Sequence, residues 1–174
     1  MQLGAARTSL SETDKSYQSV VEAERLAQQA GAELTTLINQ LRPPGLESKT
    51  LTSAIKEYVD DWSRQNKVES EIKIDTDVSV NLQTEQTLFR VLQEALANVA
   101  RHSKANKVIV SLKSEKEDIE LMIEDNGVGF DAKQIAKGIG LDSMQERLIA
   151  VNGKVDVVSE KSKGTRVIAK VRIS

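Results

Sequence analysis

The sequence predicts an α+β sandwich, in which helices cover one face of an antiparallel or mixed sheet. Apolar residues recur with helical spacing in residues 51–64 and 84–101. Segments that alternate apolar and polar residues, or that are rich in Val and Ile, indicate strands around these helices. A further helix, residues 141–151, is expected between the third and fourth strands. The expected strands are residues 68–74, 107–113, 118–124, 154–159 and 165–173.

The composition of the 174-residue chain fits a folded protein with an aliphatic core. Aromatic residues make up only 3% and the net charge is -2, which disfavours a partner that is a nucleic acid. The absence of cysteine excludes disulfides and zinc sites of the Cys/His type. No membrane-spanning run and no secretory segment is present, so we expect a cytoplasmic location without membrane contact. A piece of a membrane protein would look the same.

Residues 17–41 are expected to form a long helix that ends before the prolines at 43 and 44. Residues 3–10 have a helix-like composition, and together the two segments predict a helical hairpin within a first domain, 1–44. A lone hairpin buries little apolar surface, so we expect its seam to form a homodimer, unless the long helix packs on its own globular domain, 45–174. The seam consists of Val20, Ala23, Ala27, Ala30, Leu34, Leu37 and Leu41.

Capping residues and apolar spacing predict the ends and buried faces of the later helices. Thr84 is expected to be the N-cap of its helix. Asn152 and Gly153 are expected to end the last helix with a left-handed backbone, and residues 161–164 to form a hairpin turn. The expected core residues are Leu51, Ile55, Tyr58, Val59, Trp62, Leu88, Val91, Leu92, Ala95 and Val99.

Four short motifs in a fixed order are candidates for a binding site. The first is a polar helix face, because residues three and four apart are neighbours on a helix. The second places an acidic residue and paired glycines directly after a strand. In the third, glycines precede a helix N-terminus, where free amides suit phosphate. The motifs contain Glu94, Asn98, Arg101 and His102; then Asp125, Gly127 and Gly129; then Lys137, Gly138, Gly140 and Leu141; and finally Gly164 and Thr165.

Each motif also has an ordinary structural explanation. The polar helix face could be a solvated surface, and the glycine segments could be a turn, a flexible entry loop and a hairpin turn. The phosphate-binding sequences of P-loop proteins and the glycine fingerprint of Rossmann domains are absent.

Taken together, the motifs resemble the N, G1, G2 and G3 boxes of the GHKL ATPase and kinase superfamily. They are most similar to the ATP-binding catalytic domain of sensor histidine kinases, in the nitrate-sensor and DesK-like branch. The resemblance extends over residues 83–173 and implies a two-layer sandwich of the Bergerat type. The branch is indicated by Gln93-Glu94-Ala95-Leu96-x-Asn98-x-x-Arg101-His102-Ser103 and by Gly140-Leu141-x-x-Met144-x-x-Arg147.

The resemblance implies ATP and Mg²⁺ as cofactors and a role for each matching residue. Asp125 would accept a hydrogen bond from the adenine amino group, and Asn98 would offer its oxygen to Mg²⁺. Glu94 would orient a water of that ion or act as the acid/base group in phosphoryl transfer. Arg101 and His102 would meet phosphate oxygens. The remaining nucleotide-binding residues would be Gly127, Gly129, Lys137, Gly138, Gly140 and Leu141 around the phosphates, and Gly164 and Thr165 behind the adenine.

The sequence departs from the family at its phosphate acceptor, because no histidine precedes His102. Residues 17–41 resemble the second helix of the dimerisation domain, so the chain is expected to begin inside the first. Such a chain would bind ATP without phosphorylating itself at the usual position, and its further partner would be a response regulator. The alternatives are a serine kinase of the anti-sigma-factor type and a non-catalytic dimerisation or interaction module.

Overall fold

The computed structural model describes residues 15–40, 43, 45–47, 49–74, 79–115, 117–130 and 139–173. The chain divides into two units, residues 1–42 and 43–174. In the first unit the described element is α2 (Lys15–Gln40), which confirms the predicted long helix. Its seam residues Ala23, Ala27 and Ala30 are exposed. The predicted short arm at residues 3–10 lies outside the described residues.

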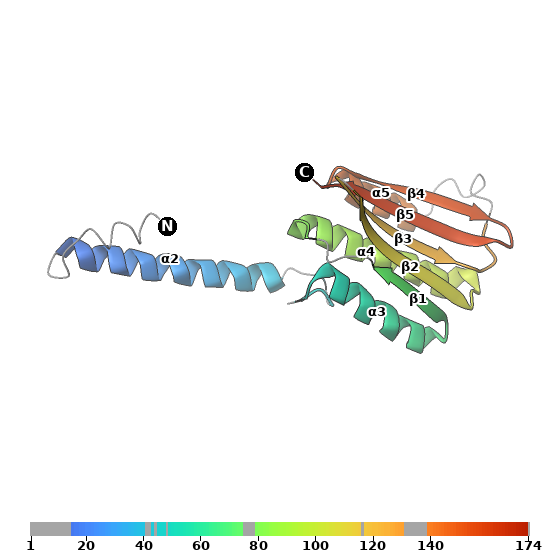
Figure 1. Ribbon diagram of the computed structural model, residues 1–174, viewed down its shortest axis with the longest axis horizontal. Coiled ribbons are helices and arrows are strands. Elements are labelled where there is room, and N and C mark those ends of the chain that lie inside the picture. Colours follow the sequence, from blue (N-terminus) through green and yellow to red (C-terminus); the bar gives the residue numbers. More distant parts are fainter. Residues whose placement is uncertain are drawn as a thin grey trace. The chain divides into compact units, whose positions relative to one another are not determined.

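The second unit contains a five-stranded mixed sheet in the order β1-β2-β3-β5-β4 (Figure 1). Strand β1 pairs with β2 in parallel, and the other neighbours are antiparallel. The predicted α+β class is therefore confirmed, and all five predicted strands are present. The strands are β1 (Glu69–Ile74), β2 (Lys107–Glu115), β3 (Asp118–Asp125), β4 (Gly153–Glu160) and β5 (Gly164–Arg172).

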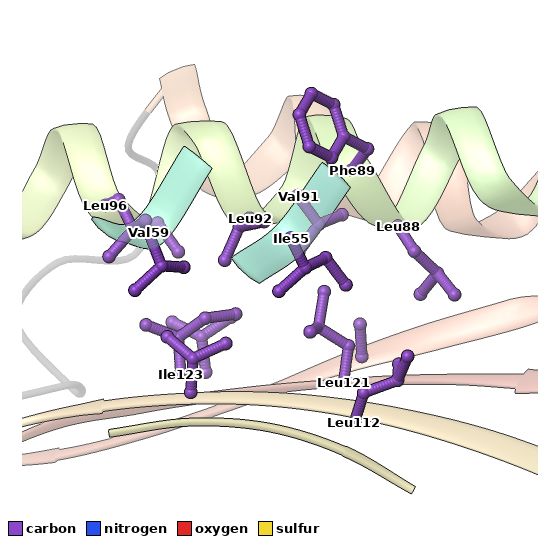
Figure 2. Packing of buried hydrophobic residues seen from close by; sticks show 14 of the residues in the cluster. Ile55, Val59, Leu88, Phe89, Val91, Leu92, Leu96, Leu112, Leu121 and Ile123 are labelled. Atoms are coloured by element: carbon purple, nitrogen blue, oxygen red, sulfur yellow. The ribbon is translucent and has the colours of Figure 1, made fainter. Parts of the chain in front are cut away.

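Three helices cover one face of this sheet: α3 (Leu51–Asn66), α4 (Leu82–Asn98) and α5 (Ile139–Ile149) (Figure 1). Figure 2 shows strand side chains such as Leu121 and Ile123 pointing toward α4. Each fully buried aliphatic side chain of this kind contributes roughly 1.5–3 kcal/mol to stability. The core includes Ile55, Val59, Leu88, Val91, Leu92, Leu96, Val108, Val110, Leu112, Ile119, Leu121 and Ile123.

Helix α4 is buried on more than the predicted stripe. Phe89 is fully buried, yet its ring lies on the side of α4 that faces away from the sheet (Figure 2). The ring packs edge-on against the half-buried Tyr58, with 5.5 Å between centroids. A Cβ on Gly45 would lie 3.2 Å from Phe89, so the segment before α3 also covers this ring. Helix α4 is therefore covered by the sheet on one side and by α3 and the segment before it on the other.

The N-cap predicted for α4 is wrong by three residues. Asn81 has the extended backbone of a cap, and its side-chain oxygen accepts the N–H of Thr84 at 2.9 Å. Thr84 is instead buried in the first turn. An Asn side chain caps as well as a Thr side chain does, so local sequence alone allowed both positions.

The end of α4 also differs from the prediction of a helix through Arg101. The α-helix ends at Asn98 and continues as a π-helical turn, η1 (Val99–Ser103). The Ser103 hydroxyl donates to the Val99 carbonyl at 2.9 Å, and Lys104 ends the turn with a left-handed backbone, φ 53°. π-Helical turns are rare in proteins overall, but those that occur are often found at functional sites.

Helix α5 begins and ends two residues earlier than predicted. Asn152 has the expected left-handed backbone, φ 55°, whereas Gly153 already begins β4. Within the described ranges, none of the helices has the length and apolar character needed to span a membrane.

Candidate functional site

A pocket of about 740 Å³ opens between α4, η1, α5 and the helix-covered face of β3, β4 and β5. It brings together nine of the residues that the motifs predicted: Glu94, Asn98, Arg101, His102, Asp125, Gly129, Gly140, Leu141 and Thr165. The polar face of α4 therefore lines a pocket, as expected for a binding site. Lys137 and Gly138 lie outside the described residues.

Asp125 is the acidic group that the fold buries in this pocket. It is the last residue of β3 and is only 5% exposed. Burial raises the pKa of the Asp125 carboxyl above its ordinary value, and the nearby Glu124 acts in the same direction. Backbone hydrogen bonds from Gly127 and Thr165 oppose this change because they favour the ionised form. The result is a desolvated acceptor that suits a ligand with an amino group.

The loop after β3 is fixed by backbone hydrogen bonds on two sides. The Val128 N–H donates to the Ser103 carbonyl of the π-helical turn at 2.7 Å. The Val128 carbonyl accepts the N–H of Ser162, in the hairpin between β4 and β5, also at 2.7 Å. The loop after β3 therefore connects the end of α4 to the hairpin between β4 and β5.

A third attachment of the same loop comes from the side chain of Asn126. Its oxygen accepts the backbone N–H groups of Asn106 and Lys107, both at 3.1 Å. Its nitrogen donates to the Asn106 side chain at 2.7 Å. These bonds fix the loop to the beginning of β2, so that the loop enters the site with a defined backbone.

Two of the predicted glycines, Gly127 and Gly164, pack next to Asp125 and do not line the pocket. A Cβ on Gly127 would overlap the Ser103 carbonyl oxygen, and a Cβ on Gly164 would overlap the Asp125 carbonyl oxygen. The Gly127 N–H, expected to face phosphate, instead donates to Asp125 Oδ1 at 2.8 Å. Gly127 permits close approach to the Ser103 backbone and the Asp125 carboxylate, and Gly164 permits close approach to the Asp125 backbone. Gly164 also has a left-handed φ of 84°.

Gly140 permits a close approach of another kind, between the first turn of α5 and the side chain of Glu94. A Cβ at this position in the first turn of α5 would overlap Oε1 of Glu94, and it would lie 3.5 Å from Nδ2 of Asn98. The end of a flexible side chain, and not the backbone, occupies that space. The missing Cβ therefore lets the Glu94 carboxylate lie directly beside the first turn of α5.

Several residues of the pocket were not among the predicted site residues. Ser143 and Arg147 line it from α5 at positions three and seven after Gly140, a helical spacing that the sequence does show. Phe130, directly after Gly129, also lines it. The apolar wall could not be assigned before the sheet register was known; it includes Ala95, Val99, Ile123, Val157 and Val167.

The mixed sheet, its single layer of helices and the ordered motifs around the pocket define a class of protein, the GHKL-type domains. The chain belongs to the family of histidine kinase-, DNA gyrase B-, and HSP90-like ATPases, whose sequence profile matches residues 83–174.

Curated relatives extend this similarity beyond the matched domain. The chain is 38% identical over 161 residues to the sensor histidine kinase LiaS of Bacillus subtilis (strain 168), covering 92% of this chain and 44% of LiaS. It is 35% identical over 159 residues to the sensor protein VraS of Staphylococcus haemolyticus, covering 90% of this chain and 45% of VraS. The chain thus spans less than half the length of these relatives.

Solved structures show the same fold at low sequence identity. The histidine kinase domain of the blue-light activated kinase of Erythrobacter litoralis EL346 aligns with a TM-score of 0.60 and 16% identity, covering 99% of this chain and 91% of that one. The histidine kinase AdeS of Acinetobacter baumannii aligns with a TM-score of 0.58 and 19% identity, again covering 99% of this chain and 91% of that one.

The two kinds of close approach predict effects of different size on stability when a methyl group is added. Gly127→Ala should lower the free energy of unfolding by about 2 kcal/mol or more, because the backbone must move. Gly140→Ala should change it by about 1 kcal/mol or less, because only the Glu94 side chain has to rotate and alanine favours the helix. Denaturant unfolding of both variants measures the difference. Equal destabilisation would contradict this assignment.

Proposed function

We propose that residues 45–174 are the ATP-binding catalytic domain of a sensor histidine kinase, and that residues 1–44 are part of its dimerisation and phosphotransfer domain. The observation that carries the proposal is the buried Asp125 carboxylate in a pocket whose helical wall presents Glu94 and Asn98. The similarity to sensor kinases over 90% or more of the chain supports it. We place the domain in the cytoplasm, where ATP is available.

In this proposal Asp125 selects adenine. Its ionised carboxylate accepts an N–H of the 6-amino group, whereas the 6-carbonyl oxygen of guanine would be repelled. The apolar side chains of Ile123, Val157 and Val167 line the same pocket and suit the faces of a purine ring. The selectivity for ATP over GTP therefore depends on one buried charge.

The residues present also fit Mg²⁺ held together with nucleotide phosphates. Within the described ranges, no group of three or more His, Asp or Glu side chains forms a complete protein cage for a metal. Mg²⁺ does not need such a cage, because it is commonly held by one or two protein oxygens, waters and phosphates. Asn98 would supply an oxygen directly, and Arg101 and His102 line the same pocket, where they can meet phosphate oxygens.

When Mg-ATP is bound, the nucleotide supplies the γ-phosphoryl group and the ion neutralises charge on its oxygens. Transfer forms a P–N bond to an imidazole nitrogen of the acceptor and breaks the bond from the γ-phosphorus to the bridging oxygen, so ADP leaves. Glu94 either accepts the imidazole N–H proton or orients a water of the ion. The wall position of Glu94, beside the first turn of α5, suits both roles.

The acceptor in this proposal is a histidine outside the 174 residues. The single histidine of the sequence, His102, lies in the pocket wall of the catalytic domain itself. The phosphoryl group would then pass to a response regulator, the partner that this class of kinase serves.

Asp125→Asn should abolish Mg-ATP binding while the protein remains folded. The Asn oxygen can still accept the Gly127 N–H, and loss of the buried charge removes a desolvation cost. The Asn amide would, however, present a donor to the adenine amino group. Calorimetric titration with Mg-ATP, and with Mg-GTP as control, measures this. Unchanged ATP affinity in the variant, or no ATP binding by the unaltered chain, would refute the proposed pocket.

Nucleotide affinity should also fall at acidic pH. The pKa of Asp125 is raised in the folded protein, and the ligand requires the ionised form. Binding is therefore full above this raised pKa and is lost as the pH falls through it, beginning at a higher pH than an ordinary Asp would give. Titrations with adenosine, which carries no phosphate, separate this loss from protonation of the nucleotide phosphates. A flat adenosine profile down to the ordinary Asp range would contradict the assignment.

The proposed dimer predicts a selective effect on α2. Ala27→Arg places a charge in the seam and should yield a monomer, because an unpaired charge in an apolar interface is costly. Gln28→Arg adds the same charge to an exposed position outside the seam and should leave a dimer. Sedimentation velocity measures both. A dimer of unchanged stability in Ala27→Arg would show that the seam is not the interface.

A further inference from the structure

The hydroxyl group of Ser159, on β4, makes three hydrogen bonds that connect the edges of the pocket. It accepts the backbone N–H of Phe130 at 2.9 Å. It lies 3.1 Å from the Gly164 carbonyl oxygen, to which it donates. It also lies 2.9 Å from the hydroxyl oxygen of Thr165. Ser159 itself does not line the pocket, and none of the sequence motifs includes it.

Only one arrangement of protons satisfies all three contacts. The Phe130 N–H can only donate, and the Gly164 carbonyl can only accept. A serine hydroxyl has a single proton, which must therefore go to Gly164. In the contact between the two hydroxyls, Thr165 is then the donor and Ser159 the acceptor. The Thr165 oxygen consequently keeps its lone pairs free to accept a further hydrogen bond.

The sheet register places this acceptor beside Asp125. Thr165 pairs with Asp125 on β3 and with Ser159 on β4, so the three residues form one row across the sheet. Directly opposed residues of antiparallel strands have Cβ atoms about 4.5–5.5 Å apart. Asp125 and Thr165 both line the pocket. Their end of the pocket thus presents a carboxylate and a hydroxyl whose own proton is already committed to Ser159.

We propose that Ser159 is a positioning residue for nucleobase selectivity, which holds Thr165 as a hydrogen-bond acceptor toward the ligand. This inference rests on the proposed binding of an adenine nucleotide and adds to it a second selecting group. A purine with a 6-amino group can donate to both acceptors, directly or through a water. The 6-carbonyl oxygen of a 6-oxopurine can only accept, so it can bond to Thr165 only if the threonine proton is released to donate to it.

The test compares Mg-ATP with Mg-ITP, whose base carries a 6-carbonyl group in place of the amino group. Ser159→Ala frees the Thr165 hydroxyl to rotate and its proton to donate to a 6-carbonyl group, so ITP affinity should rise relative to ATP affinity. The ratio of the two affinities should narrow about three- to tenfold, the usual effect of one hydrogen bond. Ser159→Thr restores a hydroxyl and should recover the ratio. Ser162→Ala changes an exposed serine of the same hairpin and should leave it unchanged.

A merely structural role of Ser159 gives a different result. Looser attachment of Phe130 and Gly164 would weaken ATP and ITP by the same factor, and an unchanged ratio in Ser159→Ala would overturn the inference. If Ser159→Ala fails to fold, Thr165→Val removes the acceptor with little change in shape. That variant should narrow the ratio by a similar factor, and an unchanged ratio would overturn the inference equally.

The outcomes also separate this inference from the proposed function. No ATP binding by the unaltered chain refutes the nucleotide pocket as a whole. ATP binding that is lost in Asp125→Asn but keeps its ratio to ITP in Ser159→Ala refutes the role of Ser159 alone.

Discussion

The buried carboxylate of Asp125 is the constraint on which the rest of the site depends. A charge at the end of a central strand is tolerated only if donors approach it closely, and here the Gly127 amide does so. The backbone must then pass so near to Asp125 and to Ser103 that neither Gly127 nor Gly164 has room for a Cβ. Glycines that resemble flexible loop residues in the sequence are therefore required by close backbone packing around Asp125 and Ser103.

The same requirement explains the irregular end of α4. A regular α-helix through residue 103 would direct the last carbonyls along its own axis. The π-helical turn instead presents the Ser103 carbonyl to the Val128 N–H, and the hydroxyl of Ser103 donates to the Val99 carbonyl. The helix that carries Glu94 and Asn98 and the loop that follows Asp125 are thereby held as one unit.

The sequence predicted the elements well because apolar periodicity reports burial directly. It predicted the site through the order of polar and glycine residues, and nine of those residues do meet in one pocket. It could not predict which glycines face the ligand, since that depends on backbone contacts between segments far apart in the chain. Phe89 was missed for a related reason: the second covering of α4 comes from Tyr58 and the segment at Gly45. Asn81 and Thr84 are equally good caps locally, and only packing decides between them.

The stability of the fold and the binding of a ligand both depend on Asp125. Its raised pKa means that the unliganded fold carries an ionised group at a cost, which the backbone donors reduce but do not remove. A ligand that donates to this carboxylate relieves the remaining cost and so stabilises the folded state as well as occupying the pocket. Because Asp125, Thr165 and Ser159 share one row of the sheet, that stabilisation acts on three strands together. In the proposed function, the same few hydrogen bonds therefore give the pocket its selectivity and stabilise the fold.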